Sequence, residues 1–143
     1  MRIADVLRNK GAEVATVAPE TTVTELLTGL AERNIGAMVV VGPDGVKGIV
    51  SERDVVRKLH EHGADMLTWP VSDIMTTIVV TCAPGDAVDS LSGVMTKHRV
   101  RHVPVLDAGR LAGIVSIGDV VKTRMEELQT EQEQLQAYIT QGG

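Results

Sequence analysis

Hydrophobic positions along the chain follow a helical spacing first and a strand spacing afterwards. Within residues 23–30 the apolar residues are three and four positions apart, which predicts a helix with one buried face. The apolar runs AMVVV (37–41) and VKGIV (46–50) follow, and the turn sequence GPDG between them predicts a hairpin of two strands. A short extended segment that contains Thr16 precedes this helix and ends in Ala-Pro, a helix-start signal. A second helix is expected directly after Ser51.

The same order of elements recurs 65 positions later. Residues 14–57 align without a gap on residues 79–122, and 14 of the 44 aligned positions are identical. The clearest match is GIVSERDVV, which begins at Gly48, with GIVSIGDVV, which begins at Gly113. A shorter similar segment, which we call the echo, precedes each copy: IADVL (3–7) before the first and VSDIM (71–75) before the second. Because the sheet of one such unit has an apolar face that it cannot bury alone, we expect the two copies to pack together.

The predicted fold is α/β (α+β), with two β-α-β-β-α units packed sheet-to-sheet with pseudo-twofold symmetry and a C-terminal helix after them. We assign residues 1–62 to the first unit, 63–70 to a linker, 71–124 to the second unit and 125–143 to a helical tail. The candidate N-cap residues for the first helix of each unit are Thr21 and Asp86.

Each copy places a serine and an aspartate three residues apart directly after a strand, as Ser51 with Asp54 and as Ser116 with Asp119. The structural interpretation is a helix start, with serine as N-cap and the acid completing a capping box. The functional interpretation uses the same geometry, because a helix N-terminus suits an anion and a carboxylate can accept hydrogen bonds from the two hydroxyls of a ribose. The two interpretations do not exclude each other.

Composition and charge exclude several classes of function. Apolar residues make up 43% of the chain and charged residues 23%, as in a soluble globular protein. The absence of Phe argues against a binder of single-stranded nucleic acid, and the net charge of −5 argues against duplex DNA. A single cysteine excludes a disulfide framework, and neither Cys82 nor the histidines have the spacing of a metal site. The sequence shows neither a signal peptide nor an apolar run of membrane-spanning length, so we expect a cytoplasmic protein with no membrane partner.

The repeated unit with GIVSERD and GIVSIGD resembles a tandem pair of cystathionine β-synthase (CBS) domains, also called a Bateman module, and is most similar to the stand-alone bacterial type. The resemblance covers roughly residues 1–124. It implies a regulatory module that is not an enzyme and has no catalytic cofactor. Such a module binds an adenine nucleotide in clefts between the units; AMP is the first candidate, and ADP, ATP or NAD(H) are others. It also implies a homodimer whose ligand alters contacts with an effector protein that the sequence does not identify.

The resemblance assigns ligand contacts by position. Asp54 and Asp119 would accept hydrogen bonds from ribose, the two serines would contact the ribose–phosphate region, and Thr16 and Thr81 would meet the adenine edge. Each cleft would draw on both units, so the first cleft would combine Asp54 with Thr81, Arg101 and His102, and the second would combine Asp119 with Thr16, Ile35, Gly36 and Ala37. The full set of candidate ligand-binding residues is Thr16, Ile35, Gly36, Ala37, Ser51, Arg53, Asp54, Thr81, Arg101, His102, Val103, Pro104, Ser116 and Asp119.

The two clefts are expected to differ in charge. Arg101 and His102 align with Gly36 and Ala37, so the first cleft would hold cationic donors for phosphate that the second lacks. Arg53 would strengthen the first cleft, and Arg99 and Lys122 are weaker candidates. The alternative is that the basic segment before the strand VPVL is a solvated patch. We expect the first cleft to bind phosphate more tightly.

The tail carries an apolar stripe that consists of Met125, Leu128, Leu135, Tyr138 and Ile139. Gln132 interrupts this stripe, so a long coiled coil is not expected. The tail would either pack on its own unit or cross to a second subunit as the clasp of a homodimer. The alternative function for the whole chain is a constitutive dimeric scaffold with vestigial clefts. An enzyme is disfavoured, because no nucleophile and base can be paired in the sequence.

Overall fold

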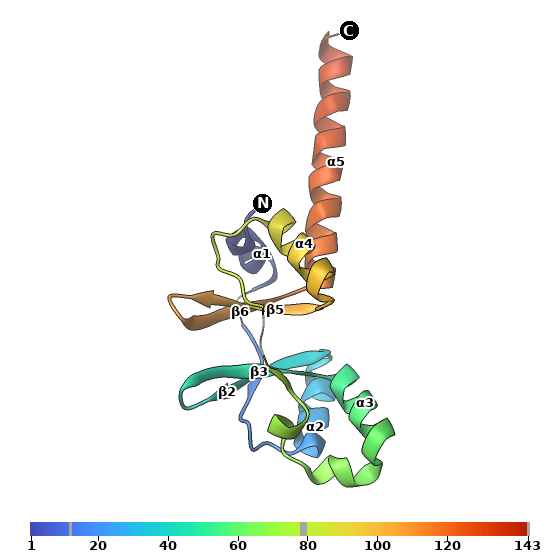
Figure 1. Ribbon diagram of the computed structural model, residues 1–143. Helices are drawn as coiled ribbons and strands as arrows, with labels where there is room; N and C mark the ends of the chain where they lie inside the picture. The colour runs from blue at the N-terminus through green and yellow to red at the C-terminus, as the bar shows by residue number, and fades with distance from the viewer. Residues whose placement is uncertain (12, 78–79, 143) are drawn as a thin grey trace.

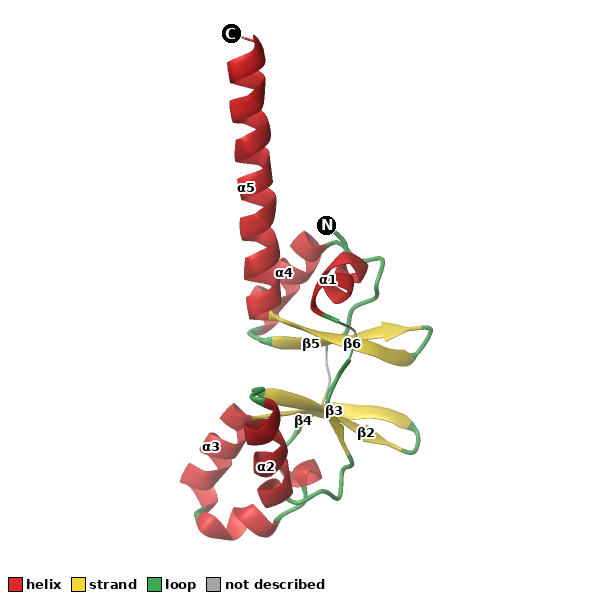
Figure 2. Ribbon diagram, turned by 180° about the vertical axis from the view of Figure 1, so that it is seen from behind, coloured by secondary structure: helices red, strands yellow, loops and turns green. Residues whose placement is uncertain are grey.

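Two small sheets face each other across the middle of the molecule, and helices cover the outer face of each sheet (Figure 1 and Figure 2). The computed structural model describes residues 1–11, 13–77 and 80–142, so Val79, at which the second copy of the repeat begins, lies outside the described residues. The two sheets, the covering helices and the helix at the C-terminal end confirm the predicted fold class.

Within the described residues the first sheet has four strands, in the order β1 (Thr16–Val17), β2 (Ala37–Gly42), β3 (Gly45–Ser51) and β4 (Thr76–Thr77). The β2–β3 hairpin is antiparallel, β1 runs parallel to β2, and β4 pairs with β3 beside Gly48 and Ile49. Helices α2 (Val23–Arg33) and α3 (Glu52–His62) complete the predicted order of the first copy. Strand β4 was not predicted, because its two threonines lie outside the aligned repeat.

The second sheet consists of β5 (His102–Asp107) and β6 (Arg110–Ser116), with α4 (Val88–His98) and the start of α5 (Ile117–Gly142) beside it. The extended strand expected around Thr81 is reduced to one parallel bridge between Cys82 and Val105. In the first copy the Val39 amide donates to the Ala15 carbonyl at 3.2 Å. The residue equivalent to Val39 is Pro104, which has no N–H, so the second copy cannot form this bond.

Each hydrophobic core takes in a segment from the other half of the sequence. Helix α1 (Ile3–Lys10) packs into the core of the second unit, with Ile3 fully buried beside residues of α4, β5 and β6. Val71 and Ile74 pack in the same way into the core of the first unit. The short echoes IADVL and VSDIM are therefore the two exchanged segments, and the packing units do not coincide with the sequence halves.

Residues assigned to the linker pack on the first unit. They contain the 3₁₀ helix η1 (Ala64–Thr68), in which Met66 is fully buried in the core of the first unit. The 3₁₀ helix η2 (Val71–Asp73) follows at once.

Two glycines of the repeat let the exchanged segments approach the sheets closely. A Cβ atom on Gly48 would lie 2.6 Å from the Thr76 carbonyl oxygen and 2.9 Å from Met75 Sδ. A Cβ atom on Gly113 would lie 2.7 Å from Leu7 Cδ2. Leu7 and Met75 are the last residues of IADVL and VSDIM, so the contact between the exchanged segment and the glycine of the sheet is equivalent in the two packing units.

The helix ends differ from the sequence prediction in two places. Thr22, not Thr21, is the N-cap of α2, and its side chain accepts a hydrogen bond from the Glu25 amide at 3.2 Å. The N-cap of α4 is Ala87, while Asp86 accepts from the Ala83 amide in the preceding turn. Both expected caps were wrong by one residue, because Thr21 and Asp86 lie one position before the extended residue at which each helix begins.

Helix α5 is continuous from the second unit into the tail. It begins at Ile117 and runs to Gly142, so the expected tail continues the helix that follows Ser116. Figure 1 shows it extending well beyond the rest of the molecule, and every residue from 128 to 141 is exposed. The alternative in which the tail packs on its own unit is therefore not what the structure shows.

Candidate functional site

Both repeated Ser-x-x-Asp segments form capping boxes at a helix start. The Ser51 amide donates to Asp54 Oδ2 at 2.8 Å, and the Asp54 amide donates to Ser51 Oγ at 3.3 Å. The corresponding bonds between Ser116 and Asp119 measure 2.8 and 3.2 Å. The structural interpretation of the motif is confirmed, and in both copies the box uses only Oδ2 of the carboxylate.

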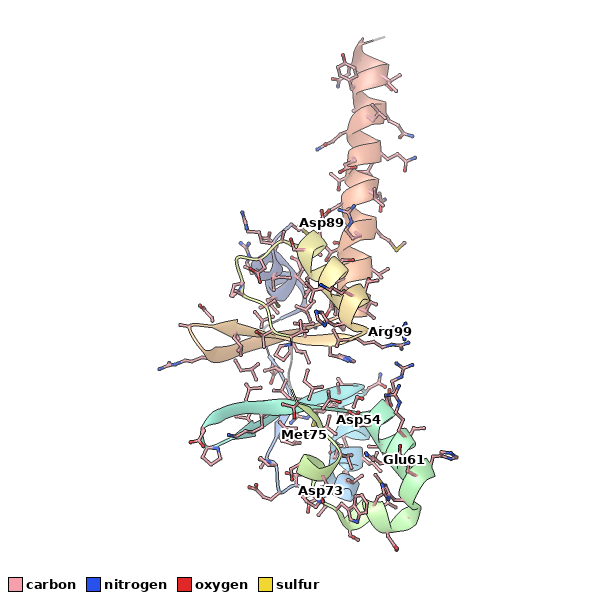
Figure 3. The ribbon with its side chains drawn as sticks, viewed as in Figure 1. Asp54, Glu61, Asp73, Met75, Asp89 and Arg99 are labelled. Carbon is pink, nitrogen blue, oxygen red and sulfur yellow. The ribbon has the colours of Figure 1, made fainter. Side chains whose placement is uncertain are left out.

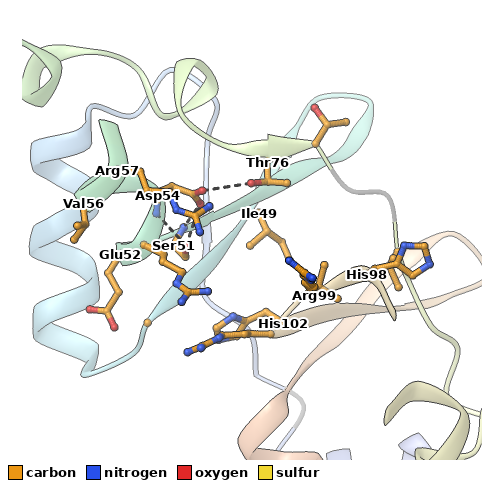
Figure 4. Close-up of a pocket in the computed structure, with 16 residues that line it drawn as sticks. Ile49, Ser51, Glu52, Asp54, Val56, Arg57, Thr76, His98, Arg99 and His102 are labelled. Carbon is orange, nitrogen blue, oxygen red and sulfur yellow. Dashed lines mark hydrogen bonds between the residues drawn. The ribbon is translucent and has the colours of Figure 1, made fainter. Parts of the chain in front are cut away.

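A cavity of about 640 Å³ opens between the two units beside Asp54. The first unit contributes residues of β3, β4 and α3, and the second contributes the end of α4 and the start of β5 (Figure 4). We call it the Asp54 cavity. Its lining residues are Gly36, Ile49, Ser51, Glu52, Arg53, Asp54, Val56, Arg57, Thr76, Thr77, Val80, His98, Arg99, Val100, Arg101 and His102.

The Asp54 cavity brings together most residues expected in the first cleft. Ser51, Arg53 and Asp54 line it from the first unit, and Arg101 and His102 line it from the second. Thr81, which was expected in this cleft, does not line it, and neither do the candidate residues Val103 and Pro104. Thr81 is exposed elsewhere, Val103 is fully buried in the core of the second unit, and Pro104 is buried in β5.

Sequence reasoning missed several lining residues. Thr76 and Thr77 take the place expected for Thr81, and the Thr76 hydroxyl lies 3.4 Å from Asp54 Oδ1 (Figure 4). No sequence signal identifies them, because they enter through the exchanged segment. Arg57 could have been found, since it follows Arg53 by one helical turn on α3.

Four arginines give the Asp54 cavity its positive charge. Arg53 and Arg57 lie on α3, Arg99 caps α4, and Arg101 precedes β5. Within the described part of the chain none of these arginines forms an ion pair with a carboxylate. Figure 3 shows Arg99 at the face of the second unit that is turned towards Asp54. The positions equivalent to them in the other copy are Gly118, Lys122, Asn34 and Gly36. The other copy therefore has no guanidinium group at these four equivalent positions.

His102 does not supply the fixed positive charge that the sequence suggested. Burial lowers the pKa of His102, and the nearby positive charges of Lys10 and Arg101 lower it further. The carboxylates of Asp119 and Glu52 act in the opposite direction but do not prevail. At neutral pH this side chain is a neutral hydrogen-bonding group in the free protein.

The residues expected in the second cleft are not brought together in the same way. Ile35 and Gly36 line a smaller cavity of about 360 Å³ with Glu52, whereas Thr16 is exposed on β1 and Ala37 is buried in β2. Asp119 lines neither of the two cavities.

Lys10 is the partner of Asp119. Its Nζ atom lies 2.6 Å from Asp119 Oδ2 and also donates to the Ile114 carbonyl at 3.0 Å. Burial alone would raise the pKa of Asp119. The hydrogen bonds from Lys10 and from the Ser116 amide, with the charge of Lys10, outweigh burial and hold it below its usual value.

Cys82 is the single cysteine of the chain, and it is buried. Burial, helped by the charge of Asp86, raises the pKa of the Cys82 thiol to about 11, so this thiol is protonated at neutral pH. The described residues contain no group of three or more side chains that could hold a metal ion. Nor do they include a helix that is both long and apolar enough to cross a membrane.

The sequence matches the CBS domain family model twice, at residues 3–61 and 71–126. The CBS domain-containing protein YhcV of Bacillus subtilis is 34% identical over 113 residues, which are 79% of this chain and 80% of YhcV. The crystal structure of a CBS-domain containing protein from Agrobacterium tumefaciens is similar with a TM-score of 0.82 and 47% identity, over 86% of this chain and 92% of that chain. A CBS domain protein from Pyrobaculum aerophilum, complexed with AMP, is similar with a TM-score of 0.74 and 28% identity, over 83% and 89% of the two chains.

Proposed function

Since the chain belongs to the CBS domain family, we propose that it is a regulatory module that binds an adenine nucleotide in the Asp54 cavity. The observation that carries this proposal is the cavity itself, because it joins a carboxylate at a helix start with four arginines from two units. The AMP complex of the Pyrobaculum aerophilum relative supports a ligand that contains adenosine. AMP is the first candidate, and ATP and NAD are the others.

The hydrogen bonds at Asp54 suit a ribose. Oδ2 is occupied by the amide and hydroxyl of Ser51, whereas the contact of Oδ1 with the Thr76 hydroxyl is long, at 3.4 Å. Oδ1 can therefore accept from ribose hydroxyls while the helix cap stays intact. The phosphate would bind Arg53 and Arg101, and adenine would pack on apolar lining such as Ile49.

Residues of both units line the cavity, so a ligand would contact both and favour one relative placement of them. A change in that placement would alter the contacts with an effector protein, provided that the ligand binds the two placements with different affinity. We propose this non-catalytic role for a cytoplasmic protein, and neither nucleic acid nor membrane takes part in it.

Thermal and urea unfolding of the full chain with AMP, ATP or NAD tests the proposal. A ligand at 100 times its dissociation constant should raise the free energy of unfolding by about 2.7 kcal/mol. Asp54→Asn should remove the effect, while Asp44→Asn should retain it because Asp44 lies exposed in the β2–β3 turn. No stabilisation of the native protein by any of the three nucleotides would favour the alternative, a scaffold with vestigial clefts.

We further propose that α5 holds two copies of the chain together. Its apolar stripe is exposed, with Leu135 at 59% and Tyr138 at 75% exposure. The side chains beside this stripe are mostly uncharged, as Gln129 and Gln136, so two copies of the helix can approach without strong repulsion. Helix packing along the stripe would make the protein a homodimer.

A further inference from the structure

The contact between Lys10 and Asp119 lies where the repeat would place a second nucleotide. Asp119 and Ile114, the two groups that Lys10 contacts, are equivalent to Asp54 and Ile49, and both of these line the Asp54 cavity. Lys10 thus lies on the surface that corresponds to the wall of the Asp54 cavity.

Lys10 also enters from the equivalent direction. Leu7 packs on Gly113 as Met75 packs on Gly48, so the end of α1 corresponds to the segment that continues into β4. In the first unit this segment sends the neutral hydroxyl of Thr76 towards Asp54, at 3.4 Å. In the second unit it sends an ammonium group to Asp119, at 2.6 Å.

The two contacts differ in strength. The side chains of Lys10 and Asp119 are 31% and 20% exposed, so the pair is partly shielded from water and stronger than a surface ion pair. A ribose at Asp119 would have to separate these charges, and its hydroxyls cannot replace a positive charge. A ribose at Asp54 displaces only a long contact with a hydroxyl.

We propose that Lys10 closes the second cleft and thereby restricts the chain to one nucleotide, bound at Asp54. Its ammonium group takes the place of the ribose hydroxyls at Asp119. The inference rests on the proposed function, since it concerns the second copy of the same kind of site. Lys10 is then the residue that determines which of the two equivalent aspartates accepts a ligand.

Equilibrium dialysis of the full chain with radiolabelled AMP counts the bound ligands directly. We expect one AMP per chain in the natural sequence and two in Lys10→Met and in Lys10→Gln. The AMP in the second cleft should bind more weakly, because Gly36 and Ala37 stand there at the positions equivalent to Arg101 and His102. Lys47→Met is the matched control, because it removes a lysine paired with Asp44 at the distant hairpin turn, and it should leave one AMP.

Asp54 variants separate this inference from the proposed function. Asp54→Asn should bind no AMP, whereas Asp54→Asn combined with Lys10→Gln should bind one. Two AMP per chain in the natural sequence, or still one in folded Lys10→Met and Lys10→Gln, would overturn the closure and leave the proposed function intact. No AMP in any variant would refute the proposed function and this inference with it.

A variant that keeps Lys10 and changes its partner Asp119 tests the inference from the other side of the contact. Asp119→Asn should leave the natural protein with one AMP at an affinity within about twofold, because Asp119 does not contact the ligand. A loss of AMP in this variant would show that Asp119 binds nucleotide in the natural protein and would overturn the proposal.

Discussion

Leu7 packs directly on Gly113, and its Cδ2 atom lies 2.7 Å from the position that a Cβ atom on this glycine would take. This contact attaches α1 to the sheet of the second unit, although the two residues lie far apart in the sequence. It explains the glycine of the repeated GIVS segment, because a side chain there would displace the Leu7 side chain from its place in the core.

Gly113→Ala should therefore destabilise the protein. A methyl group at this place overlaps Leu7 in a packed core, and overpacking of this kind costs about 1–3 kcal/mol. Urea unfolding would measure the change. Gly93→Ala is the control, since nothing lies within 4 Å of its added Cβ and alanine favours the helix α4, so that variant should be as stable or slightly more stable. Equal stability of the two alanine variants would contradict the role given to the Leu7 contact.

The sequence predicted local structure well where the signal is local. The helix and strand spacings, the hairpin turns and both capping boxes follow from residues that are close in the sequence, and the structure has them. From the repeat we also expected Asp54 and Arg101 in one cleft, because two equivalent units would pack face to face. Both residues line the Asp54 cavity. The role of each site residue in ligand binding stays a prediction.

What could not be predicted depends on contacts between distant segments. The exchange of α1 between the halves, and with it the pairing of Lys10 with Asp119, leaves no local pattern. Among the described residues, the strand expected near Thr81 is reduced to one bridge, and this difference did have a signal. Pro104 lacks the amide that its counterpart Val39 uses, and a comparison of the two copies at that position would have found it.

Arg101→Ala should weaken AMP binding by about tenfold to 100-fold, since a charge-assisted hydrogen bond to phosphate contributes about 1.5–3 kcal/mol. Isothermal titration calorimetry on the full chain measures the affinity. Arg110→Ala removes an exposed arginine from the far end of the same sheet and should have no effect. Unchanged affinity in Arg101→Ala combined with His102→Ala would refute the assignment of phosphate to this side of the cavity.

Nucleotide binding should strengthen as the pH falls from 8 towards 6. The pKa of His102 is held low in the free protein by burial and by Lys10 and Arg101, and a bound phosphate would favour the protonated ring and raise it. Binding would then take up a proton, so the affinity rises as the pH falls through the pKa of the bound state.

Calorimetry in two buffers of different ionisation enthalpy reports that proton. His102→Gln should bind AMP with a flatter pH profile and a smaller proton uptake, while any titration of the AMP phosphate itself persists in both proteins. A profile that His102→Gln leaves unchanged would show that His102 does not face the phosphate.

The exposed end of α5 predicts self-association. An isolated helix of this length is only marginally stable in water, so the residues beyond Leu128 need a partner to stay helical. Sedimentation equilibrium should give a dimer for the natural chain and a monomer after deletion of residues 126–143. Leu135→Glu should also give a monomer, because it places a charge in the centre of the apolar stripe.

Gln134→Glu is the matched control, since it adds the same charge beside the stripe rather than within it, and the dimer should persist. Gln132→Leu should tighten the dimer, because it replaces the one polar residue between Leu128 and Leu135 along the stripe. The helical circular dichroism signal should then fall less on dilution than in the natural chain. A dimer that survives both Leu135→Glu and the deletion must be held by another surface, and the role proposed for α5 would be wrong.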